Sequence, residues 1–290
     1  MFILIGLVVV FIMVFGGFML AGGKFGIIIE ALPAELMIIF GGSLGAFVMA
    51  NSTGVLSKAG KGIMKAASGS KWKAQDYRDA LCLMYILTKT MRQKGVIAVE
   101  QHIDQPEESK IFQHFPRIAA DHHLVEFICD YIRMMTMNFE DPTQMEEAMD
   151  RDIEKHTMEE HEPQHSLQTM ADGLPAIGIV AAVLGIIKTM GSINEPVEVL
   201  GRLVAGALVG TFLGIFLSYL MVAPIAGRFN QVLSEEHKMF AIIKAMMISH
   251  LHGNAPQITV EIGRRNVPTH LMPSFTEMEE AIADLPPDLA

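Results

Sequence analysis

Histidine and carboxylate side chains, the residue types that most often bind metal ions, gather in one acidic stretch of the sequence. The stretch holds His156, His161 and His165 beside Glu159 and Glu160. Zinc sites on one helix typically use the HExxH spacing, and many structural sites use cysteine pairs in CxxC. Neither pattern is present here. We therefore interpret the stretch as the solvated face of an acidic helix and expect no metal.

Covalent catalysis would need a nucleophile in a recognisable motif. No Ser, Cys or Lys stands in such a motif, and the run Lys58–Lys65 (KAGKGIMK) lacks the spacing of a phosphate-binding loop. Cys82 and Cys129 are the two cysteines, which excludes a disulfide framework and fits a reducing compartment. We expect no enzyme and no cofactor.

Ion transport would need a group inside the membrane that binds and releases the ion, usually a carboxylate. The four apolar segments described next are expected to carry none deep within them. Either the chain transports nothing, or a partner helix supplies the carboxylate.

Long apolar segments predict four membrane-spanning helices. About half of the 290 residues are hydrophobic (51%) and the net charge is −10, which indicates a membrane protein with a polar part and argues against nucleic-acid binding. A span needs about 20 apolar residues. Met1–Gly23 is uncharged and has no basic start, so we expect a retained span rather than a cleaved signal. Leu36–Leu56 is the second span, and Gly173–Gly227 holds the last two as a hairpin.

Small residues recur along one face of each helix in the hairpin, at spacings of four and three. In lipid, helix association depends on close backbone approach, so such stripes face another helix. Packing between the two helices and the lining of an ion path both remain open, and Phe216 is expected on the face opposite the second stripe. The stripes are Gly178, Ala182, Gly185 and Thr189, and Ala207, Thr211, Gly214 and Ser218.

Basic residues set the orientation of the spans. Between Lys58 and Arg78 there are six Lys and Arg residues against the single Asp76. Because such clusters next to a span stay on the cytoplasmic side, we expect both termini and residues 58–172 in the cytoplasm. A lipid headgroup site in the same cluster is compatible with this orientation.

The polar part is predicted to be helical. Apolar residues fall at helical spacing over 81–91 and over 124–135, and Asp141–Thr143 is a plausible helix start. After the hairpin the apolar positions continue as one long helix, until Gly253 and Pro256 end it.

These elements make an all-α membrane protein with four transmembrane helices, a helical cytoplasmic domain between spans 2 and 3, and a long cytoplasmic extension of span 4. The acidic tail Glu277–Ala290 is expected to be unstructured. The predicted domains are 1–57 (spans 1 and 2), 58–172 (cytoplasmic domain), 173–227 (hairpin) and 228–290 (extension and tail).

Four segments carry a resemblance to a known family. They are Pro33–Ile39 (PAELMII), Met91–Ser109 (MRQKGVIAVEQHIDQPEES), Met170–Met190 (MADGLPAIGIVAAVLGIIKTM) and Leu208–Pro224 (LVGTFLGIFLSYLMVAP). Together they resemble motility protein A, the A subunit of the bacterial flagellar motor stator, over nearly the whole chain apart from the tail.

The resemblance implies a multi-pass protein of the bacterial inner membrane, in which five A subunits surround two copies of motility protein B. It also implies that the proton-binding aspartate lies on the single span of motility protein B, and that ion flow drives rotor torque. This agrees with the missing carboxylate.

The resemblance further implies an ion pathway through the hairpin. Pro175 and Pro224 match prolines that couple ion flow to movement, and Thr211 matches a threonine near the ion. Ala182 matches a position where sodium-driven relatives carry threonine; a methyl group cannot ligate sodium, so protons are favoured. From the residues alone, Pro175 is a first-turn proline, Thr211 bonds back to its own helix, and Pro224 removes a helical hydrogen bond to Leu220 and kinks the helix.

Arg92 and Glu100 match the charged pair that contacts the rotor switch protein FliG in this family. From the residues alone, each is a solvated charge. Two alternatives stay open: an energy-transducing subunit of the ExbB and TolQ type, which typically has three spans with the amino terminus outside, and a structural scaffold without an ion path.

Overall fold

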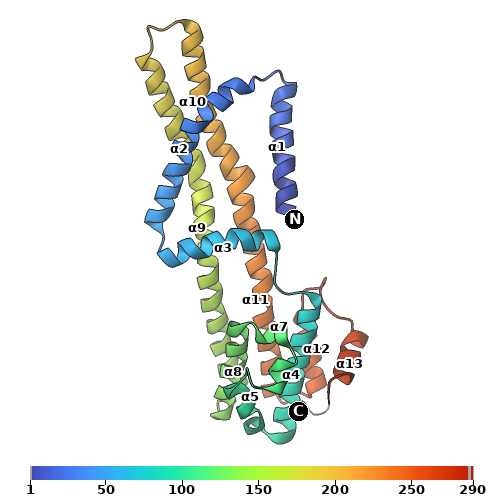
Figure 1. Cartoon of the computed structure of the whole chain (residues 1–290). Coiled ribbons are helices and arrows are strands. Elements are labelled where there is room, and N and C mark those ends of the chain that lie inside the picture. The colour runs from blue at the N-terminus through green and yellow to red at the C-terminus, as the bar shows by residue number, and fades with distance from the viewer. Residues whose placement is uncertain (1, 287–288, 290) are drawn as a thin grey trace. The chain divides into compact units, whose positions relative to one another are not determined.

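Every regular element in the computed structural model, which describes residues 2–286 and 289, is a helix (Figure 1). Contacts divide the chain into two compact units. The first, here the membrane unit, consists of Met1–Gly69 and Glu160–Leu233; the second, the polar unit, consists of Ser70–Glu159 and Ser234–Ala290. Each unit is therefore assembled from two separate stretches of sequence.

Among the residues that the structure describes, four helices are long and apolar enough to cross a membrane, which confirms the predicted number of spans. They begin with α1 (Phe2–Leu20) and α2 (Phe25–Ala50). The third is α9 (Pro142–Gly191), and the fourth starts as α10 (Val197–Leu217) and continues through a π-turn (Ser218–Val222) into α11 (Ala223–Leu251). The predicted long extension of the last span is also confirmed.

The bounds predicted for the second span were wrong. The helix begins at Phe25, eleven residues before the predicted start. It ends at Ala50 because Asn51 is extended and Ser52 caps the next helix, accepting a hydrogen bond from the N–H of Val55 at 3.4 Å. Pro33, whose missing N–H would fit the first turn of a helix, lies well inside this one. As a result Glu35 falls within the span.

Helix α3 (Thr53–Ser68) is amphipathic and packs in the membrane unit. It buries Val55, Ala59 and Ala66 and leaves Lys58 and Lys61 exposed. A Cβ atom at its Gly62 would overlap the ring of Phe229, so the absence of a side chain allows the close approach.

The polar unit is built around α4 (Ala74–Lys94), whose middle is almost entirely buried. Helix α8 (His122–Thr136) packs into the same core with the end of α11 and with α12 (Pro256–Asn266). The predicted helices over 81–91 and 124–135 are confirmed. Short elements complete the unit: η1 (Val96–Val99), α5 (Glu100–Asp104), α6 (Lys110–Gln113), α7 (Pro116–Ala119) and α13 (Phe275–Ala283).

The prediction of an unstructured tail was wrong for residues 277–283. Ser274 and Glu277 form a reciprocal capping box, with Ser274 N–H donating to Glu277 at 2.6 Å and Glu277 N–H donating to Ser274 Oγ at 3.2 Å. Met278 is buried in the core of the unit. One cap and one apolar anchor therefore outweigh the local acidity.

Candidate functional site: the membrane hairpin

The small residues of α9 and α10 lie against one another. A Cβ atom at Gly178 would lie 2.9 Å from the carbonyl oxygen of Gly210 and 3.0 Å from Cα of Gly214. A Cβ atom at Gly185 would lie 2.6 Å from that of Ala207. At these positions the stripes serve packing between the two helices of the hairpin, one of the two interpretations left open above.

The residues predicted for the ion pathway all lie on this hairpin or directly after it. Ala182 is 9% exposed and Thr211 is half-buried. Pro175 is half-buried inside α9, and Pro224 is exposed in the first turn of α11. Their roles in ion movement stay predictions.

The face of α10 that carries Phe216 is covered by another helix. Its side chain is 4% exposed, and its ring centroid lies 5.4 Å from that of Phe11 and 5.6 Å from that of Phe15. Helix α1 covers this face of α10, which helical spacing in α10 alone does not reveal.

The backbone around Pro224 departs from α-helix just before the proline. Ser218–Val222 form a π-turn in which the N–H of Ala223 donates to the carbonyl of Ser218, five residues back. Because Pro224 has no N–H, it cannot complete the ordinary bond to Leu220, and a wider turn accommodates the loss. The hydroxyl of Ser218 is buried there, with no hydrogen-bond partner among the described residues.

A buried carboxyl group lies in α2, contrary to the expectation that the spans carry none. Glu35 is 7% exposed, and its Oε2 has no hydrogen-bond partner among the described residues. Gly210 makes room for it, since a Cβ atom there would lie 2.5 Å from Oε2 and 3.2 Å from Cδ. Sequence analysis missed this group because it placed the start of the second span one residue beyond it.

Glu35 also lines a small pocket of about 170 Å³ in the membrane unit. Three other charged side chains contribute to its wall: Glu30 from the first part of α2, Lys188 from the end of α9, and Arg202 from the start of α10. Charges of both signs therefore gather where the hairpin meets α2, and ionisable groups inside a membrane commonly mark ion pathways.

The two residues predicted to contact the rotor differ in their surroundings. Arg92 is not only a solvated charge: it donates from Nη1 to the carbonyls of Gly253 and Asn254, at 2.7 Å each, and so holds the turn after α11. Glu100 is exposed at the first residue of α5. Both belong to the polar unit.

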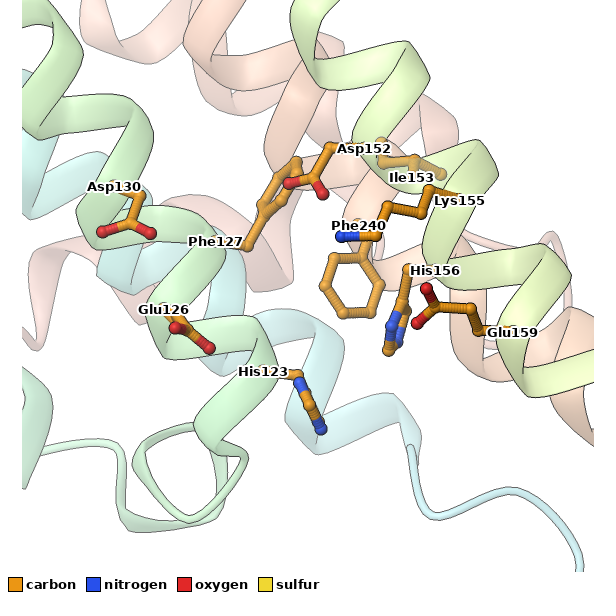
Figure 2. Close-up of a pocket in the computed structure, with 10 residues that line it drawn as sticks. All are labelled: His123, Glu126, Phe127, Asp130, Asp152, Ile153, Lys155, His156, Glu159 and Phe240. Carbon is orange, nitrogen blue, oxygen red and sulfur yellow. The ribbon is translucent and has the colours of Figure 1, made fainter. Parts of the chain in front are cut away.

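The histidines of the acidic stretch are divided between the two units. His161 and His165 belong to the membrane unit, whereas His156 belongs to the polar unit. There His156 lies close to His123 of α8 and Phe240 of α11 at the edge of a pocket (Figure 2). This grouping could not be read from sequence spacing.

Comparison with known proteins identifies the family. Residues 4–95 match the family described as Motility protein A N-terminal, and residues 119–242 match the MotA/TolQ/ExbB proton channel family. Motility protein A of Escherichia coli (strain K12) is 41% identical over 97% of this chain and 95% of its own length; that of Salmonella typhimurium is 42% identical with the same coverage.

Two solved structures share the fold. A chain of C. jejuni MotAB aligns with a TM-score of 0.71 at 18% identity, covering 92% of this chain and 95% of that one. A chain of the flagellar MotAB stator complex from Bacillus subtilis aligns with a TM-score of 0.69 at 20% identity, covering 96% and 98%. Since the match to the curated relatives extends over nearly the whole chain, the chain belongs to the motility protein A family.

Proposed function

We infer that this chain is the A-type subunit of a flagellar motor stator, a multi-pass inner-membrane protein that forms a proton channel with motility protein B and couples proton flow to rotor torque. The observation that carries the inference is the 41% identity to Motility protein A of Escherichia coli over 97% of the chain. The match to a proton channel family and the likeness to two MotAB stator structures support it.

We propose that the span of motility protein B supplies the aspartate that carries the proton, and that the hairpin forms the wall along which it moves. A neutral carboxylic acid tolerates an apolar wall, whereas a carboxylate seeks hydroxyl groups or water. Thr211 supplies the hydroxyl group that can hydrogen-bond to the aspartate when it is ionised. Ala182 offers only a methyl group, so the coupling ion is the proton rather than sodium.

The change of shape that follows proton uptake is proposed to occur at the prolines. The π-turn before Pro224 supports this role, because π-turns recur where helices must adjust at functional sites. Pro175 lies inside α9, where its missing N–H also weakens the helical hydrogen bonding.

The remaining partners are proposals of the same kind. We propose five copies of the chain around motility protein B, contact of Arg92 and Glu100 with FliG, and contact of the exposed lysines of α3 with lipid headgroups. Both termini then lie in the cytoplasm, as the positive-inside rule indicates.

Co-expression with a candidate motility protein B in a strain that lacks both stator subunits tests the function. Swimming should be restored, and it should be lost again when the membrane aspartate of the partner is replaced by asparagine. An ExbB- or TolQ-type subunit would leave the cells non-motile in both cases.

A matched pair of variants tests the ion pathway. Ala182→Leu adds bulk at a position that is 9% exposed and should abolish swimming at equal expression, whereas Leu208→Ile, at a position that is 63% exposed, should be nearly silent. If the Ala182→Leu variant swims normally, the stripe that contains Ala182 serves helix packing and does not line the ion pathway.

A further inference from the structure

We propose that the polar unit binds one divalent transition-metal ion, of the class of Zn²⁺, through the imidazoles of His123, His156 and His237. Each histidine comes from a different helix: His123 from the start of α8, His156 from α9, and His237 from α11. A bound ion would therefore link three helices of one unit.

The two ring pairs that include His156 have separations that suit a shared ion, with His156 as the central ligand. The ring centroid of His156 lies 5.2 Å from that of His123 and 5.5 Å from that of His237. With zinc–nitrogen bonds of about 2.0–2.1 Å and tetrahedral angles, two imidazole ligands of one ion have centroids roughly 5 Å apart. A ring nitrogen of His156 also lies within 4.8 Å of one of His237, so small ring rotations bring both nitrogens to ligating distance.

The pocket beside the rings attracts cations. It has a volume of about 300 Å³, and four carboxylate side chains line it against the single ammonium group of Lys155 (Figure 2). The carboxylates are those of Glu126, Asp130, Asp152 and Glu159. Glu159 follows His156 by three residues on α9, so it lies on nearly the same face, and water can complete a fourth ligand position.

The three histidines differ in how far their side chains are exposed to solvent. His237 is 9% exposed, His156 is half-buried and His123 is exposed. An ion can therefore reach the site from solvent and still bind a ligand that is held in place by the core. Neutral imidazole with a nearby carboxylate selects zinc, nickel or copper over magnesium and calcium, which prefer oxygen ligands alone.

The experiment uses the full-length chain, purified without a polyhistidine tag and stripped with a chelator. Zn²⁺ affinity is measured by competition with a chromophoric chelator, Co²⁺ absorption reports the ligand geometry, and thermal unfolding is followed with and without Zn²⁺. We expect one tightly bound Zn²⁺ per chain, tetrahedral Co²⁺ bands, and a raised Tm in the presence of Zn²⁺.

The variants His156→Gln, His123→Gln and His237→Gln should each weaken Zn²⁺ binding by at least about 10-fold, with His156→Gln the most severe. His270→Gln is the matched control, because His270 is an exposed residue of the same unit and should bind Zn²⁺ as the parent does. Should His237→Gln fail to fold, the exposed His123→Gln still decides the question.

Edge-to-face packing of aromatic rings gives similar centroid separations, and Phe240 packs against His156 at 5.2 Å. If the rings serve packing alone, the parent chain will take up no stoichiometric Zn²⁺, and the proposal is overturned. It is equally overturned if His123→Gln binds Zn²⁺ as tightly as His270→Gln does.

Discussion

At the scale of single residues, the most informative pair is Glu35 and Gly210. A carboxyl group inside a span is costly, so such groups are rare and commonly mark an ion pathway. Here it is almost completely buried, and the neighbouring helix lacks the one Cβ atom that would displace it. Gly210 therefore leaves room for the carboxyl group of Glu35 in addition to its part in helix packing.

The variant Gly210→Ala should therefore impair the motor. Its new Cβ atom would lie 2.5 Å from Glu35 Oε2 and 3.1 Å from Cβ of Ala181, so we expect a destabilisation of roughly 1–3 kcal/mol and slower or absent swimming. Gly206→Ala is the control on the same helix, since its Cβ atom would meet Ala31 only at 3.8 Å. Swimming speed and membrane protein level are measured for both; equal speeds would show that the room left for Glu35 has no function.

Reversing the charge of Arg92 should have a different effect on stability from reversing that of Glu100. Arg92→Glu removes two hydrogen bonds to the turn after α11 and should lower the free energy of unfolding by about 1 kcal/mol, besides impairing motility. Glu100→Lys alters an exposed side chain and should impair motility without changing stability. Chemical denaturation and swimming assays test both. If Glu100→Lys swims normally, this residue is not part of the rotor contact.

At the scale of elements, the junction of α11 and α12 should respond to pH. Burial lowers the pKa of His250, in the last turn of α11, below its usual 6.5; the nearby Arg92 lowers it further and Glu140 opposes the shift. Below about pH 6.5 the unfolded chain binds a proton that the folded chain does not, so stability is present above this pH and is lost as the pH falls.

We therefore expect the free energy of unfolding to decrease between pH 7 and pH 5. His250→Gln should reduce this slope without abolishing it, because burial also lowers the pKa of His102. Denaturation curves at four or five pH values measure the slope. An unchanged slope in His250→Gln would show that His250 titrates normally.

The elements also show how far sequence reasoning reaches. Four spans could be predicted because lipid imposes one simple rule, about 20 apolar residues for each span. The start of α2 was missed because Lys24 and Glu30 were assigned to a turn and Pro33 to the first turn of the helix, whereas the helix already begins at Phe25. The helix in the tail was missed because the prediction rested on the acidity of residues 277–290 and did not include the capping box at Ser274.

The candidate sites also differ in how much of each could be predicted from the sequence. The small-residue faces that hold Gly178 and Gly214 could be predicted from spacing, because helix faces follow from a fixed period; that they pack against each other is seen only in the structure. The partners of His156 could not be predicted, since α8 and α11 are distant in sequence and only tertiary packing brings them together.

At the scale of the whole molecule, membrane orientation determines which way protons pass. The hairpin loop between Gly191 and Val197 has no excess of basic residues, whereas residues 58–78 carry six against one acidic side chain. A membrane potential of 100 mV supplies about 2.3 kcal/mol for each proton that crosses. This energy drives torque in one direction only if every copy of the protein has the same orientation in the membrane.

A reporter fused after Lys71, or after Ala290, should therefore behave as cytoplasmic, and one inserted between Ile193 and Glu198 as periplasmic. A fluorescent protein that matures only in the cytoplasm and an enzyme active only in the periplasm read the two sides independently. Replacing Lys58 and Lys61 by glutamine should make this orientation less uniform, because both side chains are exposed on α3 and basic residues beside a span favour the cytoplasmic side. A periplasmic signal at Lys71 in the parent chain would contradict the four-span orientation, and with it the direction of proton flow on which torque depends.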